Sequence, residues 1–189
     1  MDSMERRPAT PEEAKALANP LRLRILRLTL DESLTNKQLA ERLGRDPGTV
    51  LHHVRQLVRT GFLVPDEGRQ GERGALEKPY RSTGKSWTLS VGDTPAEPAA
   101  SQAMLEAFLA ELAEAGPDAA AGFDRAALTL NRASREELET KVVAVLDEFA
   151  ARPADPDGEP YGLFFAMHRR APPAPRGHAS GRGGVTPRS

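Results

Sequence analysis

The chain contains no cysteine in its 189 residues. Disulfide scaffolds, thiolate metal sites and thiol redox switches are therefore excluded. Aromatic residues make up only 5% of the sequence, and no apolar run approaches the roughly 18 to 20 residues that a membrane-spanning helix needs. The N-terminus is charged and lacks an apolar signal core, so we expect a cytoplasmic protein that makes no membrane contact.

The net charge of −1 hides an asymmetry between the two halves of the chain. Residues 1–92 carry 16 basic and 12 acidic side chains, a net charge of +4, whereas residues 93–189 carry a net charge of −5. A surface that binds nucleic-acid phosphates needs local rather than overall positive charge. The N-terminal half is therefore the candidate for such a surface.

Two short helices are predicted on either side of a tight turn between Leu34 and Val64. Thr35 and Gln38 have the spacing of a capping box that begins the first helix, and Gly44 supplies the left-handed residue that ends it. Asp46 and Pro47 are an N-cap followed by a first-turn proline, so a second helix begins at once. The apolar residues of this second helix recur at helical spacing and predict a buried face: Val50, Leu51, Val54, Leu57 and Val58.

The side chains left on the outer face of the second helix are mostly hydrogen-bond donors and cations. A short helix, a tight turn and a helix with such a face form a helix-turn-helix suited to a DNA major groove. Hydroxyl, amide and imidazole groups can bond base edges, and arginine can bind guanine or phosphate. Lys37 and Arg45 flank the motif and are expected to bind phosphates. The predicted DNA-binding residues are Lys37, Arg45, Gly48, Thr49, His52, His53, Arg55, Gln56, Arg69 and Arg73.

A β-hairpin is predicted directly after the second helix, with strands at 62–64 and 80–83. A hairpin in this position is a wing, and Arg69 and Arg73 would carry its tip to a minor groove or to phosphates. Any exposed hairpin tip is charged, however, so a solvated tip without DNA contact remains an alternative. Residues 87–90 are expected to add a third short strand that packs Trp87 on the core.

The fold class predicted is α+β, with a winged helix-turn-helix domain at 10–91 and a small α/β C-terminal module at 100–170. Helices are also expected at 11–18 and 20–31, and residues 92–100 are predicted to form a linker. In the second module we predict a helix at 101–115, strands at 126–130 and 161–168, and between them a helix at 134–151 that begins with a capping box of Ser134 and Glu137. The tail at 171–189 is rich in proline, glycine and arginine and is expected to be disordered.

A metal site is the main alternative for the histidines. His52 and His53 could pair with the distant His168 and His178, but adjacent helical residues point about 100° apart and rarely chelate one ion. We therefore predict no metal and no cofactor. His168 could instead line a ligand pocket with Tyr161.

The segments 17–26, 39–40 and 49–57 together resemble the ArsR-like winged-helix repressors, over about residues 10–90. The resemblance implies a homodimer that binds an inverted-repeat operator, with residues near Thr49, His52 and His53 in the major groove. The chain departs from the metal-sensing members, because it has no cysteine near the second helix and no carboxylate and histidine set at 101–115. The later half resembles the C-terminal region of some actinobacterial winged-helix regulators, which suggests no ligand.

Together these observations predict a non-enzymatic, homodimeric regulator, most simply a repressor, that binds double-stranded operator DNA. The C-terminal module would support the dimer and could also admit a small-molecule effector. One alternative is a winged-helix module that assembles proteins without specific DNA binding. Another is an enzyme with a catalytic C-terminal module, although no nucleophile with a base, no phosphate loop and no metal cluster is visible there.

Overall fold

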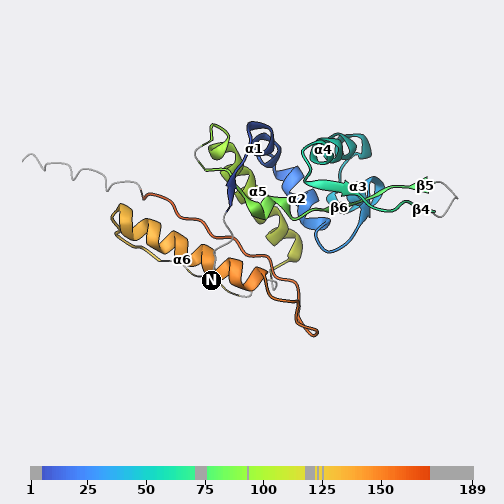
Figure 1. The fold of residues 1–189 in the computed structure, drawn as a ribbon. Coiled ribbons are helices and arrows are strands. Elements are labelled where there is room, and N and C mark those ends of the chain that lie inside the picture. The colour runs from blue at the N-terminus through green and yellow to red at the C-terminus, as the bar shows by residue number, and fades with distance from the viewer. Residues whose placement is uncertain are drawn as a thin grey trace, which may run out of the picture.

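The computed structural model describes residues 6–70, 76–92, 94–117, 122, 124 and 126–170. Short helices and strands alternate up to residue 90, and two long helices follow (Figure 1). The helices are α1 (Pro11–Leu17), α2 (Pro20–Leu28), α3 (Asn36–Leu43), α4 (Pro47–Arg59), the 3-10 turn η1 (Lys85–Thr88), α5 (Glu97–Ala115) and α6 (Arg132–Ala150). The strands are β1 (Arg7–Pro8), β2 (Leu34–Thr35), β3 (Leu63–Pro65), β4 (Arg69–Gln70), β5 (Leu76–Glu77), β6 (Pro79–Ser82) and β7 (Leu89–Ser90).

The predicted helix-turn-helix is confirmed in α3 and α4. The Thr35 hydroxyl accepts from the Gln38 backbone N–H at 3.2 Å, and the Gln38 side chain accepts from the Thr35 N–H at 2.9 Å. Gly44 ends α3 in the left-handed conformation, with φ of 59°. The Asp46 carboxylate then caps α4 by accepting from the backbone N–H groups of its first turn. Each local signal in the sequence therefore fixes the boundary at which it occurs.

The predicted wing is also present. Strands β2, β6 and β3 form a small antiparallel sheet, and β4 pairs with β5 to extend the hairpin away from the body (Figure 1). The prediction for Trp87 was wrong: it lies in η1 and its side chain is 45% exposed. Leu89 enters the core instead, because β7 pairs in parallel with β1 at the edge of the domain.

The core of the domain lies where α1 to α4 meet the sheet. Its fully buried large apolar side chains come from α2, β2, α3, α4, β3 and the turn before β3: Ile25, Leu34, Leu39, Val50, Val54, Leu57, Phe62 and Leu63. The periodic apolar face predicted for α4 supplies three of them, Val50, Val54 and Leu57. Burial of this face fixes which side of α4 points outward.

Helix α5 belongs to the winged-helix body more closely than the sequence indicated. It begins at Glu97, inside the segment expected to be a linker, and packs against α1 and α2. Its buried positions are alanines, Ala100, Ala103 and Ala107, while Met104, Leu105 and Leu109 remain exposed. Small side chains allow the close approach of α5 to the body.

The C-terminal module lacks the strands predicted for it. Residues 126–130 and 161–168 form no strand and pair with no strand of the described sheets. The physical reason is that two strands alone form only a marginally stable sheet. Helix α6 begins at Arg132 with Asn131 as its cap, three residues before the predicted cap Ser134. Phe164 stacks on Phe108 of α5 at 5.2 Å between ring centroids, so the last segment is fixed by packing instead of by a sheet.

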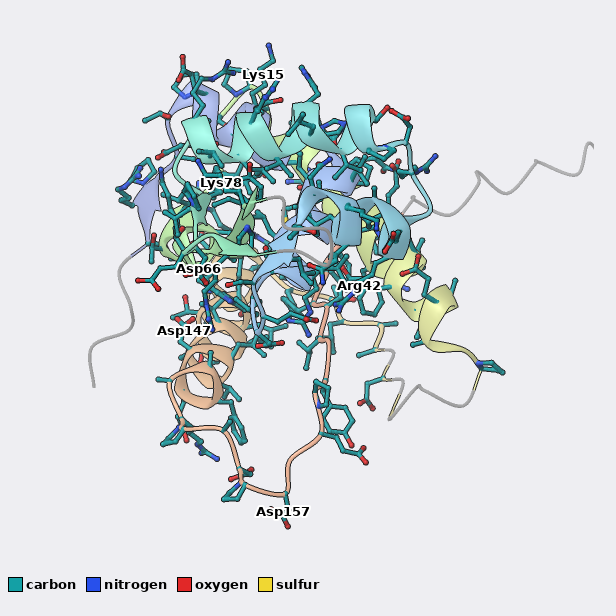
Figure 2. All side chains as sticks on the ribbon, turned by 90° about the vertical axis from the view of Figure 1, so that its right-hand side faces the viewer. Lys15, Arg42, Asp66, Lys78, Asp147 and Asp157 are labelled. Carbon is teal, nitrogen blue, oxygen red and sulfur yellow. The ribbon has the colours of Figure 1, made fainter. Side chains whose placement is uncertain are left out.

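Helix α6 lies on the side of the molecule away from α4 in both views (Figures 1 and 2). The contact between α6 and the N-terminus includes an ion pair of Asp147 with Arg6 at 3.0 Å. The tail at 171–189 lies outside the described residues. Within the residues that the structure describes, no helix is both long and apolar enough to cross a membrane.

Candidate nucleic-acid interface

One stripe of α4 points away from the core along the whole helix. Gly48, His52, Arg55 and Arg59 follow one another at spacings of four, three and four residues, which places them on one side of a helix with 100° per residue. All four are exposed. The stripe begins at the N-terminal turn of α4, the part of a recognition helix that meets base edges. It is therefore the surface of α4 that a DNA groove would receive.

Most cations of this region have no acidic partner. Arg55 and Arg59 on α4, Arg45 in the turn and Lys78 before β6 form no ion pair with any residue that the structure describes, whereas Lys37 lies 3.9 Å from Glu41. Cations without carboxylate partners keep their charge available to an incoming anion. The α4 side of the molecule thus presents a local positive surface, although the whole chain is slightly negative.

A hollow of about 290 Å³ lies between α4 and the base of the wing. Its apolar lining comes from four side chains, and its three charged lining residues are all cations. The complete lining is Val54, Arg55, Val58, Arg59, Pro65, Lys78 and Tyr80. Lys78 is labelled in Figure 2, on the wing side. An apolar surface with cations around it suits a sugar–phosphate segment, because the sugar can pack while the phosphate is neutralised.

The other flank of α4 is turned toward α2. Thr49 is exposed there, but His53 and Gln56 are only half-exposed, unlike the fully outward side chains that the sequence suggested. The Gln56 amide oxygen accepts a hydrogen bond from Nη1 of Arg22 at 3.1 Å. Gln56 is therefore already engaged within the protein, which makes it a weaker candidate for reading a base than Thr49 or His52.

Arg22 of α2 is a buried cation with only 7% of its surface exposed. Its Nε donates to the backbone oxygen of Ala16 at 2.5 Å, and its Nη2 donates to that of Lys15 at 2.7 Å. Both carbonyls belong to the last turn of α1, which has no further helical N–H to satisfy them. Arg22 therefore joins the end of α1 to the inner flank of α4.

The histidines of α4 lie against each other and against this arginine. The rings of His52 and His53 meet edge to face, with centroids 5.5 Å apart. Burial lowers the pKa of His53, and the Arg22 charge and His52 lower it further. All three effects favour the neutral form of His53.

The structure brings Gly48, Thr49, His52 and Arg55 together on the outer surface of α4 and places Arg45 in the turn before it. Arg69 begins β4 on the wing, and Arg73 lies outside the described residues. Arg59, on the outer face that the sequence predicts for α4, and Lys78, a basic residue of the predicted wing, line the same hollow. Arg22 and Tyr80 have no predicted role in DNA binding, and only the fold brings them to this region. The outward position of Arg59 follows from its spacing, since it continues the stripe of Gly48, His52 and Arg55 by one more turn.

The described part of the structure offers no set of metal ligands around the histidines of α4. Among the residues that the structure describes, no group of three histidine, aspartate or glutamate side chains is arranged to hold an ion. His168 is exposed on the last segment, where its Nδ1 lies 3.1 Å from the backbone oxygen of Arg169, and Tyr161 is 65% exposed. His178 lies outside the described residues.

Two capped helices, an outward cationic helix face and a β-hairpin wing define a winged helix-turn-helix domain of the DNA-binding, transcription-regulating class. Residues 17–65 match the family model described as a helix-turn-helix domain. The fold predicted for the N-terminal half is thereby confirmed. No curated protein matches the chain.

Solved structures of several proteins show a distant likeness to parts of the chain. Reduced HlyU from Vibrio cholerae is 25% identical over 50% of this chain and 81% of its own, with a TM-score of 0.31. The homodimeric winged helix-turn-helix DNA-binding domain of Mb0332 from Mycobacterium bovis, described as a possible ArsR-family transcriptional regulator, is 23% identical over 55% of this chain and 80% of its own, with a TM-score of 0.30. MepR from S. aureus, solved as a DNA complex, is 18% identical over 74% and 80%, with a TM-score of 0.27.

Proposed function

We propose that the protein is a non-enzymatic transcriptional regulator that binds specific double-stranded DNA as a homodimer. The observation that carries this proposal is the outward stripe of α4, where Arg55 and Arg59 lie beside the hollow of the wing and form no ion pair with a described residue. In this arrangement the first turns of α4, with Thr49 and His52, enter the major groove. The sugar–phosphate backbone beside them lies in the hollow against Arg55, Arg59 and Lys78.

The wing contributes to binding without reading sequence in this proposal. Arg69 and Arg73 are expected to bind phosphates or to enter the adjacent minor groove. Lys37 and Arg45 hold phosphates on the other side of the turn. Positioning contacts of this kind fix the register of the protein on DNA, while the few side chains near the N-terminus of α4 give specificity.

Specific binding is expected to involve two protomers per site. Purified protein mixed with random duplexes should enrich an inverted repeat, with half-sites about one helical turn, 34–36 Å, apart. Anisotropy titrations and sedimentation of the enriched duplex should give two protomers per site and an affinity that falls steeply with salt. If no sequence is enriched, the proposal of specific DNA binding fails. The alternative function, a winged-helix module that assembles proteins, would then be favoured.

The dimer surface is assigned to α5. Its alanine face packs on its own domain, whereas Met104, Leu105 and Leu109 remain 39–53% exposed on another face. The sequence offers one further apolar stripe, at residues 14–18, but it is largely buried within the protomer and cannot serve. A pair of α5 helices would cover the exposed apolar side chains and set the distance between the two recognition helices. A small-molecule effector would act by favouring one arrangement of that pair.

Replacing Leu105 and Leu109 with glutamate should convert the dimer to a monomer at micromolar concentration, because two carboxylates per protomer would have to be desolvated in the apolar interface. Sedimentation velocity measures this directly. The matched control is Ala99→Glu, an exposed position in the first turn of the same helix, which should leave the dimer intact. If the double variant remains dimeric, the α5 assignment is wrong.

A further inference from the structure

The buried arginine behind the recognition helix points one N–H at a histidine ring. Nη1 of Arg22 lies 3.5 Å from Nδ1 of His53, at the long end of hydrogen-bond distances. The same nitrogen donates to Gln56, so His53 and Gln56 share one arm of the guanidinium. The other arm is held by the backbone of α1. Arg22 is thus fixed at three sides and cannot easily turn away from the imidazole.

A guanidinium has five N–H donors, no acceptor and a permanent charge. Nδ1 of His53 can therefore interact favourably with Nη1 only as an acceptor, which means without a proton. A neutral imidazole carries one proton, and that proton must then be on Nε2. We propose that Arg22 is a positioning residue that holds His53 as the neutral Nε2–H tautomer, so that this side chain of α4 offers DNA a hydrogen-bond donor and never an acceptor.

The electrostatics of the site agree with this geometry. Protonation of Nδ1 would bring two donors and two cations together at 3.5 Å in a half-buried position. The charged or titratable groups that act on the ring are Arg22 from α2 and His52 from α4, and both lower the pKa of His53, as burial also does. Burial, Arg22 and His52 therefore all disfavour the protonated, imidazolium form of His53.

The consequence for recognition rests on the proposed function. A donor at this position of the helix favours base acceptors such as guanine N7 and O6 or thymine O4, and it disfavours the amino groups of adenine and cytosine. His53 also meets the ring of His52 edge to face, so its fixed orientation supports a residue of the outward stripe. Arg22 would in this way affect sequence preference although it lies on α2 and is buried.

The first test is the tautomer itself, measured in the full chain without DNA. Two-dimensional ¹⁵N NMR of histidine side chains separates protonated from unprotonated ring nitrogens. We expect His53 to show a protonated Nε2 and an unprotonated Nδ1 at neutral pH, with assignment from the His53→Gln variant. A protonated Nδ1 or an even mixture of tautomers would overturn the proposal. This arm does not depend on whether any variant of Arg22 folds.

The second test removes the guanidinium. In Arg22→Met, His53 should populate both tautomers and its pKa should rise toward the ordinary value, with circular dichroism used to check folding. Preference for the enriched duplex over a scrambled one should fall about tenfold, with nearly unchanged affinity for the scrambled duplex. The control is Arg27→Met on the same helix, an exposed arginine that donates to the backbone of Tyr161 and should change neither readout.

The outcomes separate the inference from the function on which its consequence rests. If the wild-type protein shows the Nε2–H tautomer but no preferred duplex, the proposed function fails while the role of Arg22 toward His53 stands. If duplex preference is strong but Arg22→Met leaves the tautomer and the preference unchanged, the positioning role is refuted.

Discussion

Replacing Arg55 and Arg59 together with alanine should weaken binding to duplex DNA of any sequence by about 60-fold at 0.1 M salt. Each phosphate contact releases condensed counterions, and its contribution follows a slope of about −0.9 in log affinity against log salt, which is roughly eightfold per contact at 0.1 M. Two contacts therefore multiply to the stated loss. Both side chains are exposed and neither has an ion pair among the described residues, so the fold should be unaffected.

The slope of the salt dependence is the sharper measurement. Loss of two contacts should reduce it by about 1.8, whereas loss of a base contact would change specificity and leave the slope nearly constant. Arg132→Ala with Arg135→Ala is the matched control, since it removes the same charge from exposed positions of α6, on the side away from α4 (Figure 1). An equal loss in the control would show that net charge, and not the hollow beside α4, is responsible.

The N-terminal domain could be predicted because its signals are local. Thr35 with Gln38, Gly44, and Asp46 with Pro47 each act within four residues, and each marks the observed helix boundary. The wing followed from two apolar segments separated by a polar, glycine-rich stretch. None of these inferences needed knowledge of distant contacts.

The C-terminal half could not be predicted in the same way, because its arrangement depends on long-range packing. Short apolar segments such as 126–130 have no preference for a strand without a ladder to join. In α5 the usual pattern is reversed, since Ala103 and Ala107 are buried and Leu109 is exposed. A prediction that places large apolar side chains in the core therefore assigns the exposed face of α5 as its buried face.

The same limit applies to the site. Helix α2 carries three arginines, Arg22, Arg24 and Arg27, and nothing in their sequence distinguishes the buried one from the others. Only the fold shows that Arg22 lies beneath α4 and that Gln56 is engaged by it. By contrast, the exposure of Arg59 could be predicted from spacing alone, because exposed positions on a helix with a known buried face recur with the helical period.

A second buried charged group holds the edge of the domain together. Glu13 of α1 is 6% exposed and accepts from both arms of Arg7 at 2.7 and 2.8 Å. Lys85 lies 2.7 Å from the same carboxylate, and it also donates to the backbone oxygen of Thr60 at the end of α4. The carboxylate thus connects β1 and α1 with η1, and through Lys85 of η1 with the C-terminus of the recognition helix.

Glu13→Gln should lower the free energy of unfolding by about 2–3 kcal/mol at pH 7. Removing one member of a buried ion pair costs about 3–5 kcal/mol, and the partial exposure of Arg7 reduces that figure. In a chain of this size the loss corresponds to a decrease in Tm of about 5–10 °C. Glu12→Gln is the control, because Glu12 lies beside Glu13 in the first turn of α1 but is exposed.

The pH dependence of unfolding gives an independent test of the same contact. The hydrogen bonds from Arg7, with those from Lys85 and Thr10, hold the pKa of Glu13 far below its ordinary value of 4.5. A depressed pKa in the folded state stabilises the protein fully above pH 4.5, and this stabilisation is lost as the pH falls below 4.5, because the unfolded chain then binds a proton that the folded chain does not. Urea titrations should therefore show the stability of the wild type and of Glu12→Gln falling more steeply between pH 5 and 3 than that of Glu13→Gln. Parallel curves for Glu13→Gln and the wild type would mean that the pKa of Glu13 is the same in the folded and unfolded chains. The contacts of Glu13 with Arg7 and Lys85 would then contribute nothing to the acid sensitivity of the protein.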